Sequence, residues 1–131
     1  PEASIATLSE LLASAEQLDD PSVVKVVASM SGNALYFSRA AIPFQRDQTE
    51  KSSSLLLAAA RRHIGLYAYR AAFLQAFAAW PPSVMETLES LEQLRALDQG
   101  HIIRICEASE PVPAGVDTPE DLERARGLLV G

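Results

Sequence analysis

An arginine stands directly after an apolar stretch that is expected to form a strand. Arg39 follows Ala34–Ser38, and its planar guanidinium could bind a carboxylate or a phosphate through two parallel hydrogen bonds. A solvated arginine at the end of a strand is the commoner alternative. The residue type and its place leave both interpretations open.

The segment 61–70, RRHIGLYAYR, alternates polar or aromatic residues with apolar ones. Alternate side chains of a strand share a face, so His63, Gly65, Tyr67 and Tyr69 would lie on one side. Imidazole and phenol groups can form hydrogen bonds with the hydroxyls of a polyol. A plain solvated sheet face gives the same pattern, and the segment by itself favours that interpretation.

Carboxylates and an amide occur at two further places. Glu92 and Gln93 are expected in the middle of a helix, where exposure to solvent is the usual explanation. Asp117 precedes a final helix that Thr118 would cap, with Pro119 at its first position. The helix dipole alone would favour a carboxylate there. An aspartate on a loop at the edge of a sheet is equally a common Mg²⁺ ligand, because this ion prefers hard oxygen donors.

The composition is that of an ordinary globular domain. Hydrophobic residues make up 48% of the 131 residues and charged residues 21%, which argues against disorder. The net charge of −6 argues against nucleic-acid binding, since phosphate backbones are bound by basic surfaces. Residues 39–70 carry six basic and two acidic side chains, a net charge of +4. This basic segment is either a solvated loop or the site of a small anionic ligand.

The single cysteine, Cys106, excludes an internal disulfide and a multi-cysteine metal site. Its apolar neighbours predict a buried side chain without reactivity. The longest apolar run, Leu55–Ala60, is too short to span a bilayer, and no signal peptide is recognised. The first residue is Pro1, which suggests a processed or excised chain, and we expect a cytoplasmic location.

Strands and helices are expected to alternate, which predicts an α/β fold. Strands are predicted at 4–8, 23–27, 34–38, 64–69 and 102–106, and helices at 11–18, around 73–80, at 83–98 and from 118 onwards. Ser83 and Glu86 form a capping box at the start of the 83–98 helix, and Gly100 would end it. The segment 43–54 is expected to be a mobile loop.

The motifs occur together, and in the same order, in one family of enzymes. The whole chain resembles the later half of the CMP-Kdo synthetases (3-deoxy-manno-octulosonate cytidylyltransferases). The matching stretches are Val23–Val27, Ala34–Ala40, Ile42–Pro43, Arg46–Asp47, Arg62–Arg70, Leu91–Arg95 and Gly115–Glu123. The pairing of RHIGLYAYR with GVDTPEDLE is the most specific part of the resemblance.

The resemblance implies a nucleotidyltransferase that couples CTP and Kdo to CMP-Kdo and pyrophosphate in lipopolysaccharide biosynthesis. It implies Mg²⁺ as the cofactor, a homodimer, and neither nucleic acid nor a membrane as partner. The implied fold is a nucleotide-diphospho-sugar-transferase-like (Rossmann-like) three-layer α/β sandwich with a mixed sheet. Residues 1–131 would form its C-terminal half.

The resemblance also implies roles for single residues in binding the sugar acid. By position, Arg39 resembles the arginine that contacts the sugar acid, and His63 and Tyr67 resemble contacts to the sugar hydroxyls. Glu92 and Gln93 match a pair of helix residues that also contact the sugar.

Two more roles follow from the same resemblance. Asp117 matches the aspartate that binds Mg²⁺ beside the sugar, together with another aspartate from the other half of the enzyme. Arg46 is a weaker candidate, for a contact from a lid loop. The match is poor over residues 48–60, and Phe44 stands where the family often has tryptophan.

The family's N-terminal half has no counterpart in these 131 residues. That half contains a basic nucleotide loop and a Gly-Asp-Glu-Pro metal motif. We therefore expect residues 1–131 to be a single partial domain, the sugar-binding and dimerisation half, without activity on its own. The alternatives are a non-catalytic binding or dimerisation module derived from the family, or part of a synthetase for 8-amino-Kdo or sialic acid.

Overall fold

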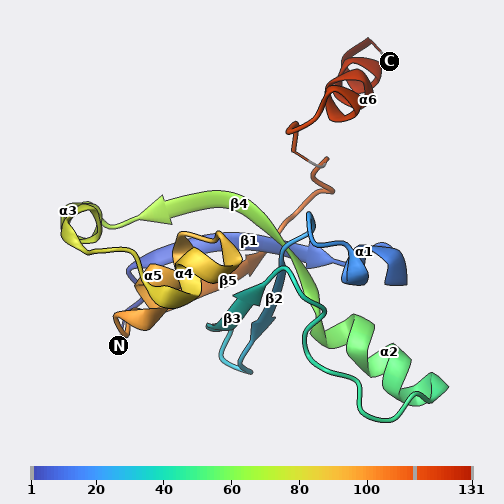
Figure 1. Cartoon of the computed structure of the whole chain (residues 1–131), viewed down its shortest axis with the longest axis horizontal. Coiled ribbons are helices and arrows are strands. Elements are labelled where there is room, and N and C mark those ends of the chain that lie inside the picture. Colours follow the sequence, from blue (N-terminus) through green and yellow to red (C-terminus); the bar gives the residue numbers. More distant parts are fainter. Residues whose placement is uncertain (1, 114, 131) are drawn as a thin grey trace.

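The structure is a computed structural model that describes residues 2–113 and 115–130. In these residues five strands form one sheet in the order β3-β2-β4-β1-β5 (Figure 1). The strands are β1 (Ile5–Leu11), β2 (Lys25–Ala28), β3 (Ala34–Ser38), β4 (Arg61–Tyr69) and β5 (Ile103–Glu107). β1 and β5 run parallel and the other neighbours antiparallel, so the predicted mixed α/β sheet is confirmed.

The helices lie around this sheet. They are α1 (Ala15–Asp19), α2 (Glu50–Ala59), α3 (Ala71–Ala79), α4 (Val84–Glu89), α5 (Gln93–Asp98) and α6 (Pro119–Val130). In Figure 1, α2 and α6 project away from the sheet, whereas α4 and α5 lie in front of it. No helix in the described residues is both long enough and apolar enough to cross a membrane.

The main core lies between the sheet and the helices α3 and α5. Phe37 and Ile103 from the sheet pack with Phe73 of α3 and with Leu94 of α5, and all four are buried. Each such side chain contributes about 1.5–3 kcal/mol through burial. This cluster fixes α5 against the sheet. Gln93 is the first residue of α5 and Glu92 is its N-cap, and the resemblance assigns both to the sugar.

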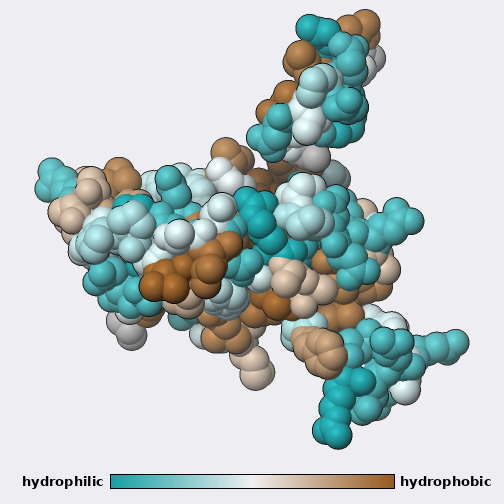
Figure 2. All heavy atoms as spheres, viewed as in Figure 1, coloured by the Kyte–Doolittle hydropathy of each residue, from teal (hydrophilic) through white to brown (hydrophobic). Residues whose placement is uncertain are grey.

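The outer side of α4 remains apolar. Val84 and Leu88 are 75% and 80% exposed, and Figure 2 shows an apolar patch over this helix. On the opposite side of α4, Glu86 is buried, with 8% of its surface exposed, and pairs with Arg95 of α5.

The predicted strands are confirmed with shifted ends, but the helix expected at 11–18 is wrong over its first half. Leu11 is the last residue of β1, because β1 continues to pair with β4 up to the Leu11–Arg61 position. The helix begins only after Ser14, whose side chain accepts a hydrogen bond from the Gln17 amide.

The loop expected at 43–54 is also wrong in its second part, because α2 begins at Glu50. Thr49 and Ser52 form a capping box, in which each side chain accepts a hydrogen bond from the other residue's backbone amide. A serine at the third helical position replaces the usual acid, and this hid the signal in the sequence.

The single helix expected at 83–98 is broken into α4 and α5. Ser83 and Glu86 form the predicted capping box at its start. Ser90 then adopts the left-handed conformation, with φ of 54°, and ends α4. Glu92 and Gln93 therefore lie at the beginning of α5 and not in the middle of a helix.

The expectation for Cys106 is wrong: its side chain is exposed. β5 is an edge strand of the described sheet, and β1 is its one neighbouring strand there. Ile103, three residues earlier, is the buried residue of this strand, and Ile105 is partly buried against the core.

Candidate functional site

A cleft of about 790 Å³ runs along β4 and collects residues from four parts of the chain. Asp20 and Ser22 come from the turn before β2, and Gln93 begins α5. The segment that leads into α6 contributes Asp117 and Thr118. From β4 the cleft is lined by Arg62, His63, Ile64, Gly65, Leu66 and Tyr67. The structure thus brings His63, Tyr67, Gln93 and Asp117 to one cavity.

His63 is held by a threonine that faces it from β1. The His63 Nε2 atom lies 2.9 Å from Thr7 Oγ1, and the same oxygen lies 2.8 Å from the Leu66 carbonyl. A hydroxyl has one proton to donate, and the carbonyl can only accept it. Thr7 therefore donates to the carbonyl and accepts from His63 Nε2–H. This leaves Nδ1 of His63 as an acceptor for a hydroxyl in the cleft.

Burial lowers the pKa of His63 from 6.5 to about 4, because the charged ring would lose its hydration. Phe37 packs against the ring with its centroid 4.9 Å away, which adds to the apolar surroundings. At neutral pH the residue is an uncharged imidazole with one free acceptor. Such a group suits hydrogen bonding to a polyol better than pairing with an anion.

The low pKa of His63 predicts a pH-dependent loss of stability. Between pH 6.5 and 4 the unfolded chain takes up a proton at this residue and the folded chain does not, so stability falls as the pH falls. The penalty should reach ~3 kcal/mol near pH 4, at about 1.4 kcal/mol for each tenfold change in proton affinity.

Urea unfolding of the chain and of a His63→Gln variant at pH 7 and pH 4 measures this penalty. The wild type should lose more stability than the variant over this range, since the variant retains the carboxylates but lacks the imidazole. Equal losses would mean that His63 is not desolvated.

A smaller cavity of about 40 Å³ adjoins this group on the helix side. Tyr67, Glu92 and Gln93 line it together with Ile5, Tyr69 and Phe77. Burial raises the pKa of Tyr67, and the neighbouring Tyr69 and Glu92 raise it further, so its hydroxyl remains a neutral donor. The rings of His63 and Tyr67 are 5.5 Å apart, as are those of Tyr67 and Tyr69. The predicted shared face of His63, Tyr67 and Tyr69 is therefore present.

Arg39 is engaged by the protein itself. Its Nε donates to the Glu89 carbonyl at 2.8 Å, and its Nη1 donates to the Pro21 carbonyl at 3.0 Å. Its Nη2 donates to the Ser90 carbonyl at 3.3 Å. The guanidinium therefore joins the turn before β2 to the end of α4. Two of its five N–H groups remain for another acceptor.

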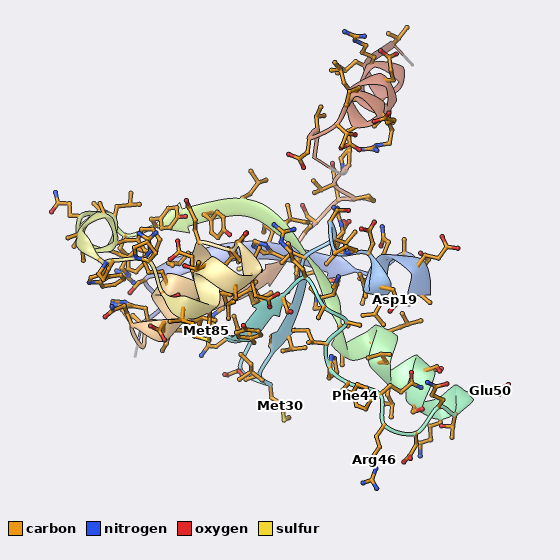
Figure 3. The ribbon with its side chains drawn as sticks, viewed as in Figure 1. Asp19, Met30, Phe44, Arg46, Glu50 and Met85 are labelled. Atoms are coloured by element: carbon orange, nitrogen blue, oxygen red, sulfur yellow. The ribbon has the colours of Figure 1, made fainter. Side chains whose placement is uncertain are left out.

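Arg46 lies away from the cleft. It belongs to a separate hollow of about 320 Å³ between the 43–47 loop and α2. In Figure 3 the Arg46 side chain points away from the sheet. Phe44 and Glu50 lie at the same end of the molecule. The structure does not bring Arg46 to the other predicted residues.

Asp117 lies at the rim of the cleft just before α6 and is exposed. Thr118 and Asp121 cap the helix instead: the Asp121 amide donates to Thr118 Oγ1 at 3.1 Å, and the Asp117 and Thr118 amides donate to the Asp121 carboxylate. Arg124 lowers the pKa of Asp121 to about 2, with help from these backbone bonds. The capping explanation for Asp117 is therefore unnecessary.

The described residues do not form a complete metal site. No group of three or more His, Cys, Asp or Glu side chains in them could hold an ion. Asp117 offers hard oxygen donors of the kind that Mg²⁺ prefers. The remaining ligands would have to come from water, from phosphate or from another part of a larger protein.

Half of the basic segment is paired within the chain. Arg62 pairs with Glu10, Arg70 with Glu2 at 2.9 Å, and Arg61 with Glu107 at 3.3 Å. These three arginines are therefore engaged by carboxylates of the chain itself.

Sequence reasoning missed three residues that support the site. Thr7 is buried and fixes His63, and a polar residue in the apolar strand IATL was the available signal. Lys25 is fully buried and donates to the Asp20 carbonyl at 2.8 Å, as its place between valines suggests. Arg95 pairs with Glu86 and lies over the Phe77 ring, with its guanidinium carbon 4.5 Å from the ring centroid.

Comparison with known proteins places the chain among enzymes that transfer cytidylyl groups. A family profile described as cytidylyltransferase matches residues 1–105, most of the chain. The chain belongs to the cytidylyltransferase family. Its relatives include the 3-deoxy-manno-octulosonate cytidylyltransferase of Stenotrophomonas maltophilia (strain K279a), 52% identical over 97% of this chain and 50% of the relative. The enzyme of the same name from Pseudomonas syringae pv. tomato is 52% identical over 98% of this chain and 52% of the relative.

A solved cytidylyltransferase structure agrees with the sequence match. The CMP:2-keto-3-deoxy-manno-octonic acid synthetase complexed with CTP superposes with a TM-score of 0.85 at 41% identity. The match covers 99% of this chain and 50% of that one. The chain is thus a homologue of the CMP-Kdo synthetases and spans about half the length of these relatives.

Proposed function

We propose that this chain is the sugar-binding and dimerisation half of a cytidylyltransferase that forms CMP-Kdo and pyrophosphate from CTP and Kdo. The observation that carries the proposal is the match of nearly the whole chain, at about 50% identity, to enzymes named for this reaction. The nucleotide would be bound mainly by the part of the enzyme that this chain does not match. A cytoplasmic homodimer is part of the same proposal.

Neutral hydrogen-bonding groups would recognise the sugar. His63 offers an acceptor at Nδ1, Tyr67 offers a phenol donor, and the amide of Gln93 offers both. Gln93 and Tyr67 each line both cavities, so one polyol could contact both residues. Glu92 lies at the smaller cavity and would accept from a further hydroxyl. A ring of hydroxyls fits this mixture of donors and acceptors better than a charged ligand does.

Arg39 would serve the acid group of the sugar. Its guanidinium borders the α4–α5 junction, immediately before Glu92 and Gln93. The two N–H groups that it keeps can bind a carboxylate, while the three carbonyl contacts hold the fork in place. Arg46 would serve only as the weaker candidate, for a contact from the lid loop 43–47.

Asp117 would supply one ligand to Mg²⁺ at the rim of the cleft. The ion would neutralise negative charge on the phosphate oxygens when bound. Asp117 can serve in this way because the capping of α6 is performed by Thr118 and Asp121.

A non-catalytic binding or dimerisation module is the second candidate. It would share the family's fold and the cleft of His63, Tyr67 and Gln93 without turnover. Among enzymes, synthetases for 8-amino-Kdo or sialic acid are the related alternatives.

The proposal is tested with a hybrid enzyme, in which residues 1–131 replace the matched segment of the Pseudomonas syringae relative. Supplied with CTP, Kdo and Mg²⁺, the hybrid should release pyrophosphate. The 131-residue chain alone should release none, because positioning of the triphosphate supplies much of the catalysis. Turnover by the chain alone would contradict the half-enzyme proposal. A folded hybrid that binds Kdo without turnover would favour the non-catalytic module.

A further inference from the structure

β4 contains a bulge in the middle of the candidate site. Thr7 of β1 is paired with Tyr67, but the next residue of β1, Leu8, is paired with Ile64. The two residues of β4 in between have no partner on β1. Because the insertion has two residues, the alternation of side chains between the two faces is the same before and after it.

The bulge shortens the distance between two residues of the site. His63 is paired with Ser9 and Tyr67 with Thr7, so four steps along β4 correspond to only two steps along β1. At about 3.4 Å a residue, four steps of a regular strand would span roughly 13 Å, whereas two steps span roughly 7 Å. The ring centroids of His63 and Tyr67 are 5.5 Å apart. The bulge thus brings both side chains within reach of one small ligand.

The side chain of Thr7 holds the bulge together. Its Oγ1 atom lies 3.1 Å from the Ile64 carbonyl and 2.8 Å from the Leu66 carbonyl. The same oxygen lies 2.9 Å from His63 Nε2, and Thr7 is only 2% exposed. Carbonyls that a bulge removes from the regular ladder need other partners. One buried hydroxyl therefore joins the bulge to the histidine ring beside it.

We propose that Thr7 is a positioning residue of the sugar site, acting through His63 and Tyr67. By holding the bulge it sets the spacing of the two rings, and by accepting from His63 Nε2–H it keeps Nδ1 as an acceptor. The ligand must then donate a hydroxyl proton to His63 and accept one from Tyr67 across a short gap, which two hydroxyls of a polyol can do. The identity of the ligand rests on the proposed function, whereas the geometry does not.

NMR spectroscopy of the chain alone tests the geometry without a ligand. The chain has two histidines, so a proton–nitrogen spectrum at neutral pH distinguishes both rings. We expect the proton of His63 on Nε2, and a nuclear Overhauser contact between the His63 and Tyr67 rings. A proton on Nδ1, or no contact between the rings, would overturn the inference whatever the enzyme's substrate is.

Thr7→Val retains the shape of the side chain and removes the hydroxyl, whereas Thr7→Ser retains the hydroxyl. The valine variant should lose the preference for the Nε2 proton and the ring contact, and the serine variant should keep both. A folded valine variant with the wild-type tautomer and ring contact would contradict the inference. Should the valine variant not fold, the wild-type spectrum and the serine variant decide.

Ser9→Ala is the matched control for Thr7→Val. Ser9 lies two residues further along the same face of β1, is fully buried, and accepts from Arg61 Nε at 2.8 Å. The control therefore removes a buried hydroxyl that does not contact the bulge. It should leave the His63 tautomer and the ring contact unchanged.

The same variants of the hybrid enzyme separate positioning from a general loss of stability. Thr7→Val should raise the KM for Kdo at least ~10-fold, as expected for the loss of a hydrogen bond, and leave the KM for CTP unchanged. Thr7→Ser and Ser9→Ala should have little effect on either KM. An unchanged KM for Kdo in Thr7→Val, or an equal rise in Ser9→Ala, would leave Thr7 with a structural role only. A folded hybrid that is inactive with Thr7 in place would instead contradict the proposed function, and the NMR spectra would then decide the role of Thr7.

Discussion

Replacing Asp117 by asparagine in the hybrid enzyme is expected to lower turnover at least ~100-fold and to leave the melting temperature within about 2 °C. The change removes a hard anionic oxygen that the amide carbonyl of asparagine replaces poorly as an Mg²⁺ ligand. Stability should hardly change because Asp117 is exposed and because Thr118 and Asp121 cap α6. Excess Mg²⁺ should restore the activity only in part. Turnover and thermal unfolding of the same preparation measure both effects.

Glu120→Gln is the matched control for Asp117→Asn. Glu120 lies in the first turn of α6, is exposed, and shares the favourable helix dipole without a proposed metal role. Asp121 is unsuitable, since its carboxylate accepts three of the bonds that hold this helix start. If Asp117→Asn loses no more activity than Glu120→Gln, Asp117 is not a metal ligand.

The Glu86→Gln substitution should lower the melting temperature of the chain by roughly 10 °C. The Glu86 carboxylate accepts from Arg95 Nε at 2.8 Å and Nη2 at 2.6 Å, and from the Ser83 amide at 3.0 Å. Removing the negative charge leaves the Arg95 guanidinium, whose side chain is 14% exposed, without its counter-ion. Because this pair joins α4 to α5, the variant of the hybrid should also bind Kdo more weakly through Gln93.

Glu123→Gln provides the comparison for Glu86→Gln. Glu123 pairs with Arg126 on α6, and their side chains are 70% and 61% exposed. An ion pair in water contributes little, so its loss should shift the melting temperature by no more than about 2 °C. A similar shift for both variants would show that the Glu86–Arg95 pair is not a buried support of the site.

Local signals were sufficient to predict most of the sheet. A β-branched run located β2, the apolar stretch Ala34–Ser38 located β3, and the Ser83–Glu86 capping box located the start of α4. Alternation along β4 predicted the shared face of His63 and Tyr67, which their rings confirm. These features depend on residues that are close together in the sequence, so they can be predicted from the sequence alone.

Features that depend on distant contacts could not be predicted. The left-handed Ser90 splits one apolar repeat into two helices, and only packing on the sheet shows where α5 begins. The three carbonyls that bind Arg39 come from segments 18 to 51 residues away. Thr7 and His63 are likewise joined across 56 positions. Roles for Arg39 and Asp117 came from resemblance and stay predictions.

Pyrophosphate release by the hybrid enzyme with CTP and Mg²⁺, measured separately with Kdo and with sialic acid, tests the central claim most directly. The neutral groups at His63, Tyr67 and Gln93, with Arg39 at the end of α4, are proposed to recognise Kdo. We expect release with Kdo to exceed release with sialic acid by at least ~100-fold, a difference of about 2.7 kcal/mol in transition-state binding. Comparable release with both sugars, or none with Kdo from a folded hybrid, would contradict the assignment of this chain to a Kdo-activating enzyme.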